Sequence, residues 1–196
     1  MKNQIIIAAL FFTFNCFAGM NTEDASISEQ PTAKTVIVIH GGAGWSQNTS
    51  DEIQDAIKAG LKTALDTGFS ILESGGSSLD AVEAAIVTLE DNPVFNAGRG
   101  SVYTAEEKQE MDASIMSGID QDAGAVASIS RVKNPIKLAR YIMEHTSHVM
   151  MAGQGAEKIA EQGRLELVDP SYFYSETRLK RVKKQKAKKN STVGAL

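Results

Sequence analysis

The stretch from Leu89 to Gly100 is the first whose residue types could support chemistry. It reads LEDNPVFNAGRG, with one proline, two asparagines and two glycines. A backbone of this composition turns repeatedly and can direct successive carbonyl oxygens towards one point. Hard cations are bound by oxygen ligands of this kind. The residues by themselves therefore predict an ordered loop that could hold an ion.

The three histidines, His40, His145 and His148, lack the spacing of a metal site. His40 has the best position for a local role, because it lies between an apolar run, Thr35–His40, and the glycine-rich stretch His40–Gly44 (HGGAG). A hydrogen-bonded histidine at the end of a strand is the alternative interpretation. No cofactor for catalysis is expected.

Glycine motifs that bind nucleotides do not occur in the chain. A G-x-G-x-x-G motif beginning at Gly42 would need glycine at position 47, which is Gln47. One beginning at Gly98 would need glycine at position 103, which is Tyr103. There is also no G-x-x-x-x-G-K-[ST] sequence, so Rossmann and P-loop proteins are excluded.

Strands and helices are predicted to alternate along the chain, which indicates an α/β layered domain. Thr35–His40 is a continuous β-branched run, typical of a strand buried on both faces. A helix beginning after Ser50 is expected to reach Gly75, with Gly68 as a place where it could break, and a second helix should end before Pro93. Further strands are expected at Ser101–Thr104, Met111–Met116, Ala123–Ile129 and His148–Met151, and further helices at Ile136–Glu144 and Ala156–Gln162.

Three of these segments together resemble one family. They are His40–Gly44 (HGGAG), Gly75–Gly100 (GGSSLDAVEAAIVTLEDNPVFNAGRG) and Met111–Met116 (MDASIM). Their order and spacing are similar to those of plant-type L-asparaginases and isoaspartyl peptidases, which are N-terminal-nucleophile hydrolases. The resemblance implies an αββα layered sandwich that is incomplete here, with only the α-subunit half present. It also implies substrates with the side-chain amide of L-asparagine or a β-aspartyl peptide bond.

The resemblance also implies a nucleophile near the end of the chain. In the family a precursor cuts itself and exposes a threonine that opens a Thr-Val-Gly-Ala motif, and Thr192–Ala195 has this sequence. Thr192 is therefore the expected nucleophile, and the bond between Ser191 and Thr192 is the expected cleavage site. A free α-amino group, with a pKa of about 8, can act as base for the hydroxyl of the same threonine.

Other expected roles follow from the same resemblance. Asn96 corresponds to an asparagine that supports the nucleophile, and His40, Gly41 and Gly42 form an activation loop for self-cleavage. A structural sodium ion is expected to bind main-chain oxygens of the loop, from Leu89, Glu90, Asn92, Phe95, Ala97 and Arg99. The implied partner is a β-subunit, assembled as two α and two β chains.

The remaining segments are interpreted from composition. Residues 1–18 resemble a secretory signal peptide with cleavage after Ala18, which would make the protein secreted or periplasmic; lipid modification of Cys16 is the alternative. Removing this leader leaves no cysteine, which excludes disulfides and thiolate catalysis. Residues 19–34 are expected to form a flexible lead-in, 35–168 the α-subunit domain, 169–191 a basic mobile linker and 192–196 the start of a truncated β-subunit.

The charge of the chain is unevenly distributed. Residues 178–189 carry eight Lys and Arg, whereas the whole chain has a net charge of −4, so the rest is acidic. An acidic body with a basic tail argues against nucleic-acid binding, and after removal of the leader no membrane-spanning run is expected.

The family's substrate-binding groups follow the nucleophile, so a catalytically inactive truncated paralogue with a binding or structural role is the alternative to a hydrolase subunit.

Overall fold

The structure is a computed structural model that describes residues 35–42 and 49–193, with side chains described up to residue 188. The predicted signal peptide and lead-in therefore lie outside the described residues, as do Ala43 and Gly44 of the HGGAG stretch. A mixed α/β architecture is present, as the alternation of patterns predicted. No helix in the described ranges is both long enough and apolar enough to cross a membrane.

The sheet is small and mixed. Strands β1 (Met111–Met116) and β2 (Ala123–Ile129) are antiparallel, and β3 (Met150–Ala152) pairs with β2 in parallel. The sequence predicted β1 and β2 with these bounds, whereas β3 begins two residues later than expected. The predicted strand at Ser101–Thr104 is wrong, because the structure forms only an isolated bridge between Tyr103 and Gln109 there.

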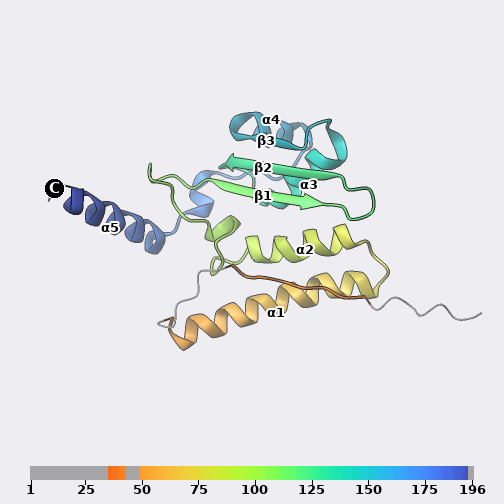
Figure 1. Cartoon of the computed structure of the whole chain (residues 1–196), viewed down its shortest axis with the longest axis horizontal. Coiled ribbons are helices and arrows are strands. Elements are labelled where there is room, and N and C mark those ends of the chain that lie inside the picture. Colours follow the sequence, from red (N-terminus) through yellow and green to blue (C-terminus); the bar gives the residue numbers. More distant parts are fainter. Residues whose placement is uncertain (1–34, 43–48, 194–196) are drawn as a thin grey trace, which may run out of the picture. The chain divides into compact units, whose positions relative to one another are not determined.

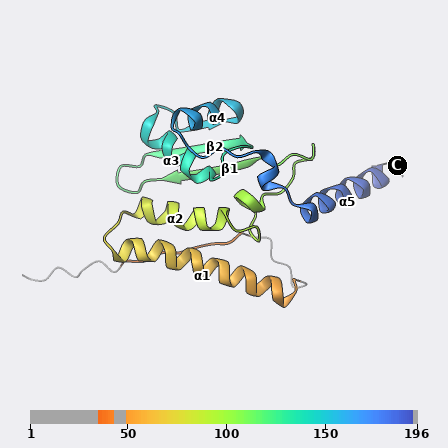
Figure 2. The ribbon, with the colours of Figure 1, turned by 180° about the vertical axis from the view of Figure 1, so that it is seen from behind.

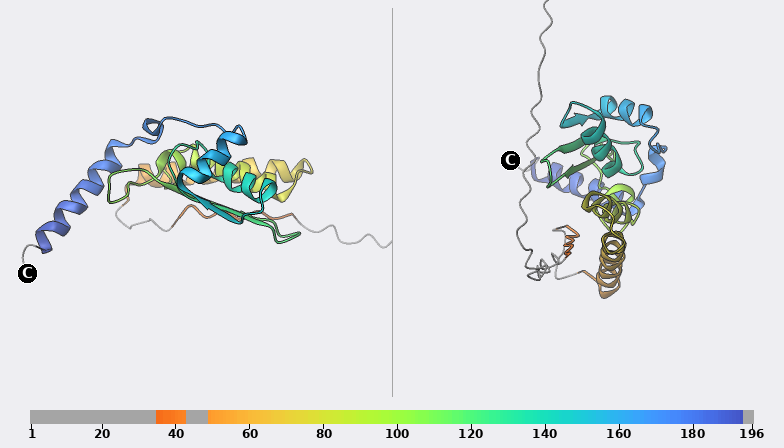
Figure 3. Two further views of the ribbon diagram at one scale, coloured as in Figure 1. Left: turned by 90° about the horizontal axis from the view of Figure 1, so that it is seen from above. Right: turned by 90° about the vertical axis from the view of Figure 1, so that its right-hand side faces the viewer.

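Helices cover one face of this sheet. Helices α3 (Pro135–His145) and α4 (Gly153–Gln162) contact β2, and α3 lies behind the sheet in Figure 1 and in front of it in Figure 2. The buried side chains of Met111, Ile115, Val126 and Ile129 form a core with α3 and α4. Side chains between them in sequence, such as Asp112 and Ser114, are exposed or half-buried, so only one face of the sheet is fully covered by the described residues (Figure 3).

Two further helices lie side by side, and one of them also contacts α3 (Figure 1). Helix α1 (Asp51–Glu73) packs along α2 (Ser78–Glu90), and α2 also contacts α3. The side chain of Ser77 accepts a hydrogen bond from the backbone N–H of Asp80, which fixes the start of α2. Helix α2 ends at Glu90, before Pro93, as expected.

The break that Gly68 would allow in the first helix does not form. Helix α1 is continuous through Gly68. The missing side chain at this position allows Ile37 and the backbone of Ala81 to lie close to the helix. A Cβ atom at this position would lie 2.6 Å from Cδ1 of Ile37 and 3.0 Å from the carbonyl oxygen of Ala81. The local cost of glycine in a helix is thus offset by closer packing of α1 against its neighbours.

The prediction that Thr35–His40 is a strand buried on both faces is also wrong. The segment forms no ladder with another strand among the described residues, and Val36 and Val38 are 69% and 86% exposed. Ile37 and Ile39 are half-buried, so one side alone contacts the body. A β-branched run predicts an extended backbone, but pairing also requires a neighbouring strand, which the run itself does not provide.

The segment expected as a mobile linker, 169–191, is helical in the structure. A 3₁₀ turn, η2 (Pro170–Phe173), leads into helix α5 (Glu176–Val193). Phe173 is buried in the core with Ile136 and Leu138, so the first part of this segment belongs to the folded body. Whether α5 moves in solution stays a prediction.

Candidate functional site

The loop after α2 is ordered by its own asparagines. The N–H of Asn92 donates to the carbonyl of Leu89 (3.2 Å), and the N–H of Phe95 donates to the carbonyl of Asn92 (3.2 Å). The side-chain Oδ1 of Asn92 accepts from the N–H of Val94 (3.1 Å). Asn92 therefore holds the first turn of the loop from both sides, which agrees with the prediction of an ordered loop.

Two glycines allow the loop to fold back on itself. Gly98 has a φ of +47°, and a Cβ atom there would lie 2.5 Å from the carbonyl oxygen of Glu90. A Cβ atom on Gly100 would collide with the carbonyl oxygens of Phe95 and Pro93. The end of the loop, including the 3₁₀ turn η1 (Gly98–Gly100), is thereby pressed against its beginning.

The predicted supporting residue, Asn96, lies at the centre of this loop. Its Oδ1 accepts a hydrogen bond from the N–H of Val102 (3.0 Å), which ties the loop to the segment that follows it. Asn96 is exposed, whereas its neighbour Phe95 is buried. The backbone thus directs one side chain into the body and the next away from it.

The predicted activation loop meets this loop at Phe95. A Cβ atom on Gly41 would lie 3.3 Å from Cε1 of the Phe95 ring, so only a residue without a side chain fits without a shift. Gly42 has a φ of +98°, and its N–H donates to Nδ1 of His40 (3.2 Å). The structure therefore brings His40–Gly42 and the loop together, and assigns His40 a local hydrogen bond.

Glu90 attaches the start of the loop to α3. Its side chain is buried, and Oε1 accepts from the backbone N–H of Ile136 in the first turn of α3 (3.0 Å). Oε2 has no hydrogen-bond partner among the residues that the structure describes. Burial raises the pKa of this carboxyl to about 8, although the bond from Ile136 acts in the opposite direction.

Arg178 of α5 binds the outside of the loop. One guanidinium nitrogen, Nη2, lies 3.3, 3.4 and 3.1 Å from the carbonyl oxygens of Pro93, Val94 and Phe95. Burial, with a smaller contribution from the charge of Arg181, lowers the pKa of Arg178. The loop can therefore direct several main-chain oxygens at one cation, which is the property that a carbonyl-bound ion requires.

The expected sodium ligands are the carbonyls of Leu89, Glu90, Asn92, Phe95, Ala97 and Arg99. The carbonyls of Leu89, Asn92 and Ala97 each accept a backbone hydrogen bond within the loop, and that of Phe95 accepts one from Arg178. A carbonyl oxygen has a second lone pair, so these bonds leave it able to coordinate an ion. The residues are compatible with the group, and sodium binding itself stays a prediction.

Ser191 and Thr192 lie in the last turn of α5. Their side chains are beyond the described ones, so their relation to Asn96 stays a prediction. Among the described residues there is no group of three or more His, Cys, Asp and Glu side chains that could hold a metal ion. The residues brought together are thus those of the loop and of His40–Gly42.

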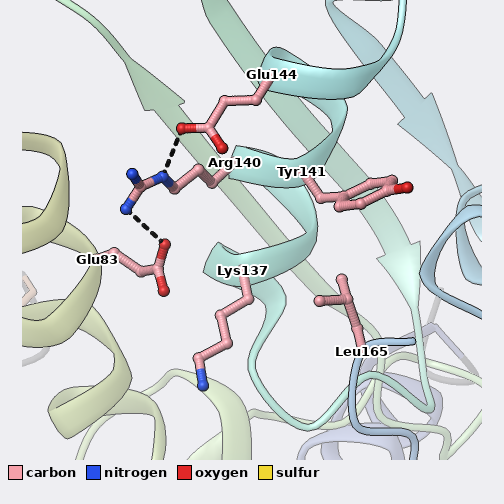
Figure 4. Close-up of a pocket in the computed structure, with 6 residues that line it drawn as sticks. All are labelled: Glu83, Lys137, Arg140, Tyr141, Glu144 and Leu165. Carbon is pink, nitrogen blue, oxygen red and sulfur yellow. Dashed lines mark hydrogen bonds and ion pairs between the residues drawn. The ribbon is translucent and has the colours of Figure 1, made fainter. Parts of the chain in front are cut away.

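An open hollow between α2 and α3 contains charged groups of a different kind (Figure 4). Arg140 lies at its centre, with Nη1 2.7 Å from Asp80 and 3.0 Å from Glu83, and with Nε 2.7 Å from Glu144. Hydrogen bonds to Glu144, which has the largest effect, and to Asp80 and Glu83 raise the pKa of the guanidinium further above its usual range. The hollow is lined by Glu83, Lys137, Arg140, Tyr141, Glu144 and Leu165. Because its arginine is already paired with three carboxylates, we interpret the cluster as a link between helices.

Sequence reasoning missed two residues that shape the loop, Glu90 through its side chain and Arg178. Nothing in the sequence distinguishes Arg178 from the seven other basic residues of 178–189. Glu90 is one of two adjacent acids at the end of a predicted helix, and only its burial against α3 separates it from Asp91.

Comparison with known proteins places these features in a family. The asparaginase family profile matches residues 33–195. A putative isoaspartyl peptidase/L-asparaginase of Dictyostelium discoideum is 46% identical over 158 residues, which are 80% of this chain and 46% of that protein. The plant-type L-asparaginase of Thermococcus kodakarensis is 50% identical over 144 residues, 74% of this chain and 45% of that protein. The isoaspartyl peptidase of Escherichia coli is 43% identical over 147 residues, 74% of this chain and 46% of that protein.

The chain spans about half the length of the curated relatives that it matches. The matched range includes the loop, the His40–Gly42 stretch and Thr192. We conclude that the chain belongs to the asparaginase family of hydrolases, whose members include isoaspartyl peptidases and plant-type L-asparaginases.

Proposed function

We propose that this chain is the α-subunit part of a self-processing amidohydrolase that acts on L-asparagine, on β-aspartyl peptides, or on both. The observation that carries the proposal is the family match, which extends through Thr192 to residue 195, together with relatives named for these two activities. The complete enzyme would adopt the αββα layered sandwich, with a second half packed against the uncovered face of the sheet.

Self-cleavage is proposed at the Ser191–Thr192 bond. The hydroxyl oxygen of Thr192 attacks the carbonyl carbon of Ser191, the C–N bond breaks, and the nitrogen takes up the proton to become the free amine of Thr192. Water then hydrolyses the ester, which releases the Ser191 carboxylate and restores the hydroxyl. The products are a chain ending at Ser191 and a chain beginning at Thr192.

The same groups support turnover in the mature enzyme. The free amine of Thr192 takes the proton of its own hydroxyl as the oxygen attacks the substrate amide. An acyl-enzyme forms, ammonia or an amine leaves, and water releases the acid. Asn96 is proposed to support the nucleophile, since the loop exposes it next to Phe95, the residue that meets Gly41. A sodium ion on the loop carbonyls would keep this surface in shape and take no part in the reaction.

The nucleophile can be tested in a polypeptide that carries these 196 residues followed by a second half from a plant-type relative. We expect mass spectrometry to show a fragment beginning at Thr192, and we expect the protein to release ammonia from L-asparagine. Thr192→Ala should abolish both, and Thr192→Ser should keep part of each because the hydroxyl remains. Thr177→Ala, on the same helix, is the matched control and should cleave normally.

An uncut Thr192→Ala protein with normal turnover would contradict the assignment.

Signal-peptide cleavage after Ala18 and export to the periplasm or the medium belong to the same proposal. They are tested by expressing the complete chain and sequencing the N-terminus of the secreted protein.

A further inference from the structure

The start of α5 is fixed to the body on both sides of residue 175. Phe173, two residues before, is buried in the core. The N–H of Ser175 donates to the hydroxyl oxygen of Tyr103 (3.2 Å), and Arg178 binds the carbonyls of residues 93–95 three residues later. The helix therefore begins in a set position against the loop that contains Asn96.

A second contact lies further along α5. Glu107, in a turn with a φ of +62°, is 3.0 Å from Nζ of Lys186 and 3.7 Å from Nζ of Lys183. The hydrogen bond from Lys186, followed by the charges of both lysines, lowers the pKa of this carboxyl. Both lysines are largely exposed and Glu107 is half-buried, so this contact is weaker than that of Arg178 and is sensitive to salt.

The proposed cleavage site is part of the same helix, because α5 extends to Val193. In an α-helix each peptide group is planar, and its N–H donates to the carbonyl four residues before it. Attack by Thr192 on the carbonyl carbon of Ser191 makes that carbon tetrahedral, so the amide loses its planar geometry. A helical Ser191–Thr192 bond is therefore unsuited to cleavage, and the last turn must unwind first.

We propose that α5 is a latch, with Arg178 as its main contact, which holds the Ser191–Thr192 bond in a helical, uncleaved state. The inference rests on the proposed function, in that the bond is the one cut during self-processing. Release of Arg178 removes the main contact between α5 and the body. A helix without such support is marginal in water, so its last turn can unwind and the bond can enter the site. Arg178 is thus a positioning residue that acts through the helix.

The docking contact can be tested in the 196-residue chain by hydrogen exchange. Arg178→Gln should speed exchange of the amides in the first three turns of α5 by roughly tenfold, the effect of losing hydrogen bonds from a charged donor. Arg178→Lys keeps the charge but not the reach, so it should give an intermediate effect. Arg181→Gln removes the same charge from an exposed position on α5 and should leave exchange unchanged. Equal exchange in Arg178→Gln and Arg181→Gln would overturn the latch.

The consequence for processing is tested in the polypeptide that includes a second half. Arg178→Gln should raise the first-order rate at which the Thr192 fragment forms, whereas Arg181→Gln should match the unsubstituted protein. An unchanged or lower rate in Arg178→Gln would overturn the latch. If the unsubstituted polypeptide does not cut at all, the proposed function fails, while the exchange experiment still decides whether Arg178 docks the helix.

Discussion

At the scale of single residues, buried carboxyl groups join segments of the described chain that are distant in sequence. Glu157 of α4 accepts from the N–H of Ser130 (2.7 Å), the hydroxyl of Ser130 (3.1 Å) and the N–H of Arg131 (3.0 Å). Glu90 does the equivalent for the start of α3. Each carboxyl group accepts from one or two backbone N–H groups distant in sequence, where an unpaired donor would be costly.

Removal of the Glu157 carboxylate should therefore destabilise the fold. Glu157→Ala is expected to lower the free energy of unfolding by about 1–3 kcal/mol, because two backbone donors lose their partner. Glu157→Gln should lose less, since one amide oxygen can still accept from all three donors. The measurement is urea denaturation of each variant.

A matched control for this prediction lies one turn away. Glu161 forms an exposed ion pair with Arg131 at 3.6 Å, and Glu161→Ala should cost less than about 1 kcal/mol. Similar losses for the two alanine variants would show that the buried donors do not depend on Glu157.

At the scale of elements, glycines decide how closely α1 approaches its neighbours. Gly60 and Gly68 are both buried in this helix. A Cβ atom at Gly60 would lie 2.7 Å from the side-chain Nδ2 of Asn92 and 2.7 Å from the ring of Phe95. Helix α1 therefore supports the candidate loop directly.

Alanine at Gly68 should destabilise the protein although alanine favours helices. The gain in helix propensity is about 1 kcal/mol, whereas a forced contact with the Ala81 carbonyl and with Ile37 costs about 1–3 kcal/mol. We expect a lower melting temperature for Gly68→Ala. Gly155→Ala, in α4 with open space around the new Cβ, should leave it unchanged or raise it. A melting temperature for Gly68→Ala at or above that of the unsubstituted chain would contradict this reading.

The ion proposed for the Leu89–Arg99 loop gives a prediction at the same scale. An ion that binds only the folded state raises stability in proportion to the logarithm of its concentration. Exchanging sodium chloride for choline chloride at equal ionic strength should therefore lower the melting temperature, and titrating sodium back should restore it. Identical melting curves in the two salts would argue that the loop binds no sodium.

At the scale of the whole molecule, the described residues present an extended segment and a sheet face with little cover. Val36 and Val38 are exposed in a segment that forms no ladder with another described strand. The chain spans about half the length of its relatives. We therefore expect the second half of the enzyme to contribute strands that pair with residues 35–40.

Hydrogen exchange can test this pairing. In the 196-residue chain the amides of Val36–Ile39 should exchange quickly, and joining a second half from a relative should slow them by orders of magnitude. The amides of β2 serve as an internal control, because their partners β1 and β3 are already present. Unchanged exchange at Val36–Ile39 would show that the second half does not pair there.

Catalysis should depend on the same assembly. The 196 residues alone are expected neither to cleave themselves nor to release ammonia from L-asparagine, because the groups that bind substrate follow the nucleophile in the family. The loss of even one oxyanion donor lowers a rate by roughly 10²–10³. An ammonia-release assay on the chain with and without the second half measures the difference.

The sequence by itself determined the α/β class, the family and most of the helices and strands. Local signals suffice for these, since side-chain periodicity, the Ser77 cap and Pro135 act within a few residues, and β1 and β2 have the predicted bounds. The order of HGGAG, the loop and MDASIM was enough to identify the family, which the comparisons confirm.

Only the tertiary structure decided what depends on contacts between distant residues. It showed that Gly68 is a packing position, that Thr35–His40 has no strand partner among the described residues, and that Phe95 joins the loop to His40–Gly42. It also singled out Arg178 from a run of similar cations, because three carbonyls 83 to 85 residues away face one of its nitrogens. Pairing, close approach and burial are properties of two segments at once, so a pattern within either segment cannot specify them.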